Sequence, residues 1–131
     1  MTSPVPVPPK QVLLVEDDPA LRKLVKGFLQ VAGFGVVEAF DGRRAMTFLK
    51  EQRFDLIVLD LMLPESSGYD VLDFIKREVP HKSPILMVSA RGLPEDRAQA
   101  EELGASMYLI KPFTRGEFTR AIKQLTESSP K

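Results

Sequence analysis

Residues 54–64 read Phe-Asp-Leu-Ile-Val-Leu-Asp-Leu-Met-Leu-Pro, and this stretch decides the fold of the chain. The four residues 56–59 are all apolar, a pattern typical of a strand that is buried on both faces. Asp60 ends the run, and Pro64 with the Ser66-Ser67-Gly68 cluster then predicts a turn. Open α/β sheets bind their ligands at the carboxyl ends of their strands, where Asp60 would lie. Taken alone, Asp60 is better explained as a helix cap or turn residue, but the rest of the chain changes this balance.

Four more apolar segments resemble this one, and a segment with the apolar spacing of a helix follows each of the five. The predicted strands are residues 12–15, 36–40, 56–59, 85–88 and 107–110. The predicted helices begin near residues 19, 42, 68, 95 and 115. Five such pairs predict an α/β fold, a doubly wound five-stranded parallel sheet with five helices on its two faces. The flavodoxin-like strand order 2-1-3-4-5 is the doubly wound arrangement that fits five units.

Residues that begin and end helices support these boundaries. Asp18, followed by proline, is predicted to cap the first helix, and Asp41 to cap the second. Gly33 predicts the end of the first helix, and Thr114 with Glu117 predicts a capping box for the last. The helix that begins near residue 95 has the weakest amphipathic pattern of the five. Its apolar positions are Ala98, Ala100 and Leu103.

Length and composition indicate one domain. With 131 residues the chain can bury a real core, and a second domain would not fit. Lys plus Arg and Asp plus Glu number 18 each, so the net charge predicts no polyanionic partner. The sequence has no cysteine for disulfides, no apolar run of about 20 residues for a membrane helix and no signal peptide. We therefore expect a cytoplasmic protein with a flexible proline-rich leader at 1–9, a folded domain at 10–127 and a disordered tail at 128–131.

Polar residues follow four of the predicted strands. Glu16 and Asp17 come after the first strand, Asp60 after the third, Ser89 after the fourth and Lys111 after the fifth. The carboxyl ends of parallel strands lie at one edge of a sheet, so we expect these side chains to converge. Crowded carboxylates repel one another unless a hard cation such as Mg²⁺ binds them. A carboxylate can also form an acyl phosphate, with a lysine and a hydroxyl as partners for the phosphoryl oxygens. The pattern therefore predicts a Mg²⁺-dependent phosphoryl site.

Four short motifs lie at these strand ends. They are Val-Glu-Asp-Asp at 15–18, Leu-Asp-Leu-Met-Leu-Pro at 59–64, Val-Ser-Ala at 88–90 and Lys-Pro-Phe at 111–113. Each motif is weak alone, but their order, spacing and position at strand ends make the set specific. Through them the sequence resembles, over residues 10–127, the receiver domain of two-component response regulators, and in particular single-domain receivers like the chemotaxis regulator.

This resemblance implies roles for the polar residues. Asp60 corresponds to the phosphorylated aspartate, and Lys111 to the lysine that binds the phosphoryl group. Glu16 and Asp17 correspond to the acidic pair at the Mg²⁺ site, with Asp17 the more direct ligand. The family also implies Asp60 and the backbone carbonyl of Met62 as metal ligands.

The resemblance also implies a switch. Ser89 has the place of the switch hydroxyl, where threonine is commoner, and Tyr108 that of the switch aromatic, although Tyr108 could instead only pack the strand. The family further implies a cis Lys111-Pro112 bond, which is accessible because the cis form costs about 0.5–1 kcal/mol before proline. Ser106-Met107 stands where many relatives have acids, a departure that concerns contacts with partners.

In this bacterial family a histidine kinase or a phosphotransfer protein donates the phosphoryl group, and phosphorylation alters a protein-interaction surface. The resemblance thus implies a downstream protein target or a phosphorylation-dependent homodimer. From the balanced charge and the composition, we expect no direct contact with nucleic acid or membrane. The only reactions implied are self-phosphorylation from a phosphodonor and autodephosphorylation, so the chain is not expected to be an enzyme in any wider sense.

Two rival functions make different demands on the sequence. A haloacid-dehalogenase-like phosphatase also uses an aspartate nucleophile, but it places a second aspartate two residues later, where this chain has Met62. A receiver that only docks, without being phosphorylated, would not require the complete acids together with Ser89 and Lys111. Incubation with Mg²⁺ and acetyl phosphate distinguishes these possibilities.

Overall fold

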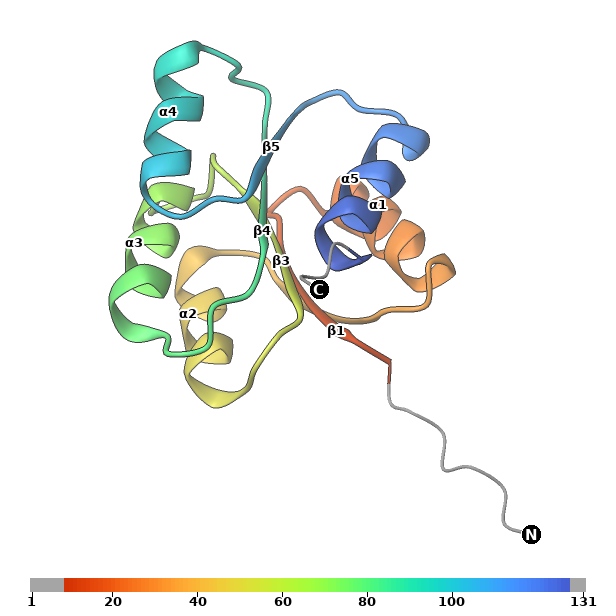
Figure 1. Ribbon diagram of the computed structural model, residues 1–131, viewed down its shortest axis with the longest axis horizontal. Helices are drawn as coiled ribbons and strands as arrows, with labels where there is room; N and C mark the ends of the chain where they lie inside the picture. The colour runs from red at the N-terminus through yellow and green to blue at the C-terminus, as the bar shows by residue number, and fades with distance from the viewer. Residues whose placement is uncertain (1–8, 128–131) are drawn as a thin grey trace, which may run out of the picture.

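Five parallel strands form one sheet in the order β2-β1-β3-β4-β5, as the sequence predicts (Figure 1). The computed structural model describes residues 9–127, so the predicted tail and most of the predicted leader lie outside the described residues. The strands are β1 (Gln11–Val15), β2 (Gly35–Ala39), β3 (Leu56–Asp60), β4 (Ile85–Ser89) and β5 (Met107–Ile110). The helices are α1 (Pro19–Val31), α2 (Gly42–Glu51), α3 (Gly68–Glu78), α4 (Pro94–Glu102) and α5 (Arg115–Glu127). In this part of the chain, no helix has the length and apolar content needed to cross a membrane.

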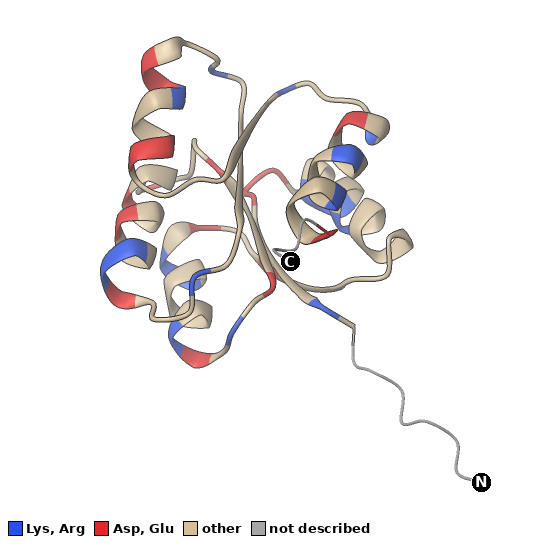
Figure 2. Cartoon of the chain, in the orientation of Figure 1, with Lys and Arg blue, Asp and Glu red and all other residues tan. Residues whose placement is uncertain are grey.

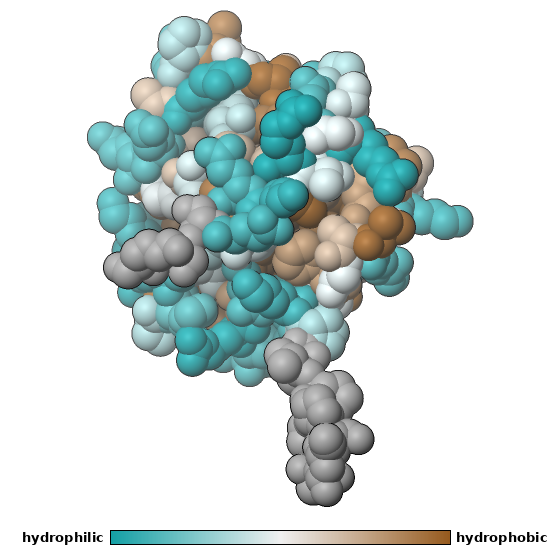
Figure 3. Space-filling model, turned by 45° about the vertical axis from the view of Figure 1, so that its right-hand side comes forward, coloured by the Kyte–Doolittle hydropathy of each residue, from teal (hydrophilic) through white to brown (hydrophobic). Residues whose placement is uncertain are grey.

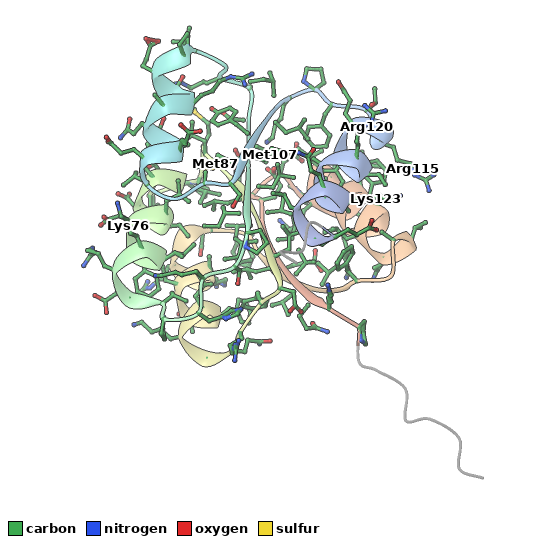
Figure 4. The ribbon with its side chains drawn as sticks, viewed as in Figure 1. Lys76, Met87, Met107, Arg115, Arg120 and Lys123 are labelled. Carbon is green, nitrogen blue, oxygen red and sulfur yellow. The ribbon has the colours of Figure 1, made fainter. Side chains whose placement is uncertain are left out.

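The strands are apolar on both faces because helices cover both. Side chains alternate along each strand, so Val58 faces the layer of α1 and α5, while Leu59 faces the layer of α2, α3 and α4. Figure 1 shows the sheet nearly edge-on between these two layers. Met87 and Met107 lie in the sheet and each contributes to one of the two cores (Figure 4). The continuous apolar runs in the sequence thus reflect burial on two sides.

The strand register brings the polar strand ends together. Val15 of β1 pairs with Leu59 of β3, so the residue after β1, Glu16, arrives beside Asp60. On its other side Asp60 pairs with Val88, one residue before the end of β4. The carboxyl ends of β1, β3 and β4 therefore lie side by side at the same edge of the sheet.

The predicted helix caps are present. The Asp18 side chain accepts hydrogen bonds from backbone N–H groups in the first turn of α1, and Asp41 does the same for α2. Thr114 and Glu117 form the reciprocal capping box before α5, with bonds of 3.0 and 2.8 Å. Gly33 follows the end of α1 with φ of +97°, a conformation that side chains other than glycine rarely adopt. These local signals predicted the starts of α1, α2 and α5 and the end of α1.

Helix α4 is fastened differently from the other helices. Ala100 is buried, but the predicted contact residue Ala98 is exposed, which makes the prediction for Ala98 wrong. A charged residue, Asp96, is instead buried in the first turn of α4. Lys76 lies on α3 (Figure 4), and its ammonium donates to the backbone carbonyl of Glu102 at 3.3 Å. Polar contacts therefore provide much of the attachment of α4.

Candidate functional site

Three carboxylates gather at the carboxyl edge of the sheet. Asp60 is the last residue of β3, and Glu16 and Asp17 directly follow β1. Glu16 and Asp60 are buried and Asp17 is exposed, and each offers an oxygen within 4.8 Å of the other two. The parallel register explains this convergence, because it sets the ends of β1 and β3 side by side.

Lys111 joins the two buried carboxylates. Its Nζ lies 2.9 Å from Oε1 of Glu16 and 2.9 Å from Oδ2 of Asp60. The lysine directly follows β5, and its backbone N–H donates to the carbonyl of Ser89 at 2.8 Å, which fixes its backbone against the end of β4. The Lys111-Pro112 bond is cis, as the resemblance implied.

Burial and charge act in opposite directions at this cluster. Burial would lower the pKa of Lys111, but its hydrogen bonds to Asp60 and Glu16 hold that pKa above its ordinary value. Burial raises the pKa of Glu16 to about 7, although the hydrogen bond from Lys111 opposes the rise. At Glu16 the effect of burial on the pKa therefore outweighs the hydrogen bond from Lys111.

The donor set fits a hard divalent cation. When all the groups are ionised, three carboxylates and one ammonium leave two negative charges uncompensated. All three acidic side chains offer oxygen, the donor that Mg²⁺ and similar ions select. The exposed Asp17 leaves the cluster open to solvent on one side, so water can complete a coordination shell.

The turn after β3 holds the Asp60 carboxylate in place. The backbone N–H of Met62 donates to Oδ1 of Asp60 at 3.0 Å, so the Met62 backbone lies beside this carboxylate. Gly68, at the start of α3, packs against the same segment, and its N–H donates to the Leu61 carbonyl at 2.7 Å. A Cβ atom at position 68 would lie 2.6 Å from the carbonyl oxygen of Asp60, so only glycine allows this approach.

Ser89 and Tyr108 lie near the cluster but turn toward the loop after β4. Ser89 is fully buried at the end of β4, and its Oγ accepts a hydrogen bond from the Arg91 N–H at 3.0 Å. The Tyr108 hydroxyl donates to the Arg91 carbonyl at 2.7 Å. The guanidinium of Arg97 lies over the Tyr108 ring, 5.4 Å from its centroid. The structure therefore groups Ser89 and Tyr108 around Arg91 and leaves the acidic cluster to Lys111.

Sequence reasoning overlooked three residues in this region, namely Arg91, Asp96 and Tyr69. Asp96 is 4% exposed, and it contacts the side chains of both other residues. The available signal was helical spacing, because Asp96 lies four residues before the buried Ala100 on the same face of α4. An aspartate in the first turn of a helix is ordinarily taken to be solvated. The spacing of Asp96 and Ala100 therefore did not indicate that Asp96 is buried.

Comparison with known proteins identifies the family of the chain. The family described as "Response regulator receiver domain" matches residues 12–123. Similar curated proteins include the transcriptional regulatory protein CpxR of Escherichia coli, 39% identical over 119 residues, and the phosphate regulon regulatory protein PhoB of Klebsiella pneumoniae, 41% identical over 115 residues. The alignments cover 91% and 87% of this chain and 50% of each relative, so the chain spans about half the length of these relatives.

Solved structures give the same result. The chemotaxis protein CheY4 of Vibrio cholerae matches with a TM-score of 0.84 and 30% identity, covering 89% of this chain and 98% of that one. The receiver domain of the sensor histidine kinase PA1611 from Pseudomonas aeruginosa matches with a TM-score of 0.82 and 32% identity, covering 91% and 98%. That structure has a magnesium ion coordinated in its active site cleft. With its fold, its acidic cluster and these similarities, the chain belongs to the family of response regulator receiver domains, the phosphoacceptors of two-component systems.

Proposed function

We propose that Asp60 accepts a phosphoryl group from the phosphohistidine of a histidine kinase or a phosphotransfer protein. The observation that carries this proposal is the place of Asp60, buried at the end of the central strand with one carboxylate oxygen on Lys111. Its other oxygen accepts the Met62 N–H. A carboxylate held in one orientation is prepared for attack on phosphorus.

The transfer exchanges one bond to phosphorus for another. An oxygen of the Asp60 carboxylate attacks phosphorus, the bond from phosphorus to the histidine nitrogen breaks, and that nitrogen keeps the electron pair and takes a proton from solvent. The Lys111 ammonium, now 2.9 Å from Asp60, pairs with the phosphoryl oxygens. Water later attacks the same phosphorus, which releases phosphate and restores the carboxylate. These two reactions are the whole of the proposed chemistry.

Mg²⁺ is the cofactor that the cluster fits. Glu16, Asp17 and Asp60 would hold it, together with the Met62 backbone carbonyl. When bound, Mg²⁺ neutralises the carboxylates and the incoming phosphoryl oxygens. The open side at Asp17 leaves room for water among the ligands.

A protein phosphodonor is supported by the surface next to Lys111. A groove of about 350 Å³ is lined by the apolar residues Leu21, Leu24, Ala90, Pro112 and Phe113 and by Lys111. Figure 3, in which the side of α1 and α5 is turned forward, shows hydrophobic surface on that side of the molecule. Leu24 is 52% exposed there. Apolar surface of this kind suits a protein partner better than a small, fully charged donor.

The proposed output is a change in the surface formed by α4, β5 and α5. Ser89 would turn from the Arg91 N–H to the phosphoryl group, and Tyr108 would turn into the space that the loop vacates. Helix α4 has four acidic residues and one basic residue, Arg97, whereas α5 has two acidic residues and three basic ones, Arg115, Arg120 and Lys123 (Figures 2 and 4). This complementary pattern supports contact with a downstream protein or a second copy of the chain.

The proposal also covers where the chain would act and what it would not do. The chain would act in the bacterial cytoplasm and would not be an enzyme beyond self-phosphorylation and autodephosphorylation. It would not contact nucleic acid or membrane directly, in keeping with equal numbers of acidic and basic residues.

The test is phosphoryl incorporation from acetyl phosphate with Mg²⁺, followed by mass spectrometry. Asp60→Asn should abolish the acid-labile product because the nucleophilic oxygen is lost. Asp73→Asn, on the surface of α3, is the matched control and should be labelled like the wild type, because within residues 9–127 Asp73 pairs only with Arg77. Undiminished labelling of Asp60→Asn would exclude Asp60, and no labelling of any variant would favour a receiver that only docks.

A further inference from the structure

Arg91, in the loop after β4, joins three parts of the molecule. Its backbone N–H donates to Oγ of Ser89 at 3.0 Å, and its carbonyl accepts from the Tyr108 hydroxyl at 2.7 Å. Its guanidinium lies 3.0 Å from Oδ1 of Asp96 in the first turn of α4. One residue thus contacts the proposed hydroxyl switch, the proposed aromatic switch and the helix that follows.

The Asp96 carboxylate is buried with few partners. Its side chain is 5% exposed, and Oδ1 accepts from the Tyr69 hydroxyl at 3.1 Å as well as from Arg91. Oδ2 is buried and has no hydrogen-bond partner among residues 9–127. Burial and the bond to Asp96 raise the pKa of Tyr69 to about 12, so its hydroxyl keeps its proton and remains a donor. Arg91 is therefore the only cation that neutralises this buried charge within the described residues.

The remaining attachment of α4 is weak at its N-terminal end. The N-cap residue Leu93 makes no side-chain cap, so the first turn depends on the contacts of Asp96. Ala100 supplies the buried apolar contact further along, and Lys76 reaches the opposite end of the helix. Loss of the Arg91–Asp96 pair would thus loosen the first turn of α4 in preference to the last.

We propose that Arg91 is a positioning residue that couples Ser89 to helix α4 through its ion pair with buried Asp96. In the structure described here, the bond from the Arg91 N–H occupies the Ser89 hydroxyl. Movement of that hydroxyl toward Asp60 breaks this bond, shifts the loop and withdraws the Arg91 guanidinium from Asp96. The first turn of α4 then holds an unpaired buried charge and opens. The coupling rests on the proposed function of Asp60, whereas the anchoring of α4 by Arg91 does not.

Anchoring is tested on the unphosphorylated chain by amide hydrogen exchange. Arg91→Ala should raise exchange rates in the first turn of α4 by about tenfold, because removal of one partner leaves a buried charge unpaired. Arg91→Lys, which keeps the charge, should restore part of the protection. The double variant Arg91→Ala with Asp96→Asn should also recover protection, since the unpaired charge is gone. Arg77→Ala, at an exposed arginine of α3, is the control and should leave α4 unchanged.

A role limited to filling space would give a different result, because Asp96→Asn would then not rescue Arg91→Ala. Failure of that rescue, or unchanged α4 exchange in Arg91→Ala, would overturn the anchoring role.

Coupling is tested with beryllofluoride, a phosphoryl mimic, and Mg²⁺. In the wild type, exchange should change both around Asp60 and in α4. In Arg91→Ala the change around Asp60 should persist, while α4, already loosened, should respond little. An equal α4 response in both proteins would overturn the coupling. Absence of any response around Asp60 in the wild type would overturn the proposed function and the coupling together, and the anchoring result would stand on its own.

Discussion

The Asp60 carboxylate has little freedom to move. Lys111 contacts one oxygen and the Met62 N–H contacts the other, at 2.9 and 3.0 Å. Behind it, Gly68 packs directly on the Asp60 backbone. Nucleophilic attack requires alignment, and a displacement of about 1 Å can cost about 100-fold in rate. The residues that shape the turn after β3 are therefore as important to the site as its charged groups.

Gly68→Ala should damage both stability and phosphorylation. The new Cβ would lie 2.6 Å from the Asp60 carbonyl oxygen and 2.8 Å from the Leu61 Cα, and both are backbone atoms that cannot rotate away. We expect a loss of about 1–3 kcal/mol in the free energy of unfolding and slower labelling by acetyl phosphate. Gly27→Ala is the control, because in α1 a Cβ there meets no described atom within 4 Å. That variant should be neutral or stabilising, and equal behaviour of the two would contradict the argument.

The secondary-structure elements differ in the contacts that hold them in the fold, which are apolar for some and polar for others. The strands and α1, α2, α3 and α5 bury apolar stripes, whereas α4 buries the single apolar residue Ala100 and relies further on Asp96 and on a bond from Lys76. At the opposite edge of the sheet, Glu38 of β2 pairs with two cations of α1, Lys26 at 2.8 Å and Arg22 at 3.2 Å. Polar contacts therefore help to hold the elements at both edges of the sheet, whereas apolar packing holds the central strands.

The Glu38 pairs predict a pH-dependent contribution to stability. The hydrogen bond from Lys26, followed by that from Arg22, lowers the pKa of Glu38 below its ordinary value of 4.5. A lowered folded-state pKa stabilises the fold above pH 4.5, and this stabilisation is lost as the pH falls through the folded-state pKa. Because these groups are partly exposed, Glu38→Gln should cost only about 0.5–1 kcal/mol at pH 7.

Thermal unfolding at pH 7 and pH 3, with and without added salt, measures this effect. The difference between Glu38→Gln and the wild type should shrink at pH 3 and in salt. Glu51→Gln is a suitable control, since Glu51 is exposed and makes no ion pair in the part of the chain that the structure covers. A difference for Glu38→Gln that is independent of pH would indicate lost packing rather than lost charge.

At the scale of the whole molecule, the acidic cluster connects segments that are far apart in the sequence. Lys111 and Glu16 are separated by 95 residues, yet they make a 2.9 Å contact. The uncompensated carboxylates oppose folding, and a cation that binds only the folded chain would remove this penalty. Metal binding should therefore be visible as global stability.

Mg²⁺ should raise the melting temperature, and Asp17→Ala should abolish that increase. At ten times its dissociation constant, the ion should stabilise the chain by about 1.4 kcal/mol. Without Mg²⁺, Asp17→Ala should be slightly more stable than the wild type, because a repelling carboxylate is gone. Asp18→Asn is the matched control, since asparagine also caps helices and Asp18 lies outside the cluster. A Mg²⁺ effect retained in Asp17→Ala would place the ion elsewhere.

Much of this fold could be predicted because its signals are local. Apolar runs identified all five strands, and caps such as Asp18 and Thr114 identified helix starts to within a residue or two. The convergence of Glu16, Asp60 and Lys111 was also predictable, since parallel strands place their carboxyl ends at one edge. These inferences need only the pattern along the chain and the general geometry of parallel sheets.

The sequence by itself thus determined the strands, their parallel arrangement and the edge at which the acids meet. Only the tertiary structure decided which partner each polar group takes. Ser89 could face Asp60 or the loop, and it bonds to the Arg91 N–H. Asp96 could have been solvated, and it is buried because Tyr69, 27 residues away, and Arg91 both reach it. The burial of Asp96 depends on contacts between side chains from different elements, and periodicity along one element carries no information about them.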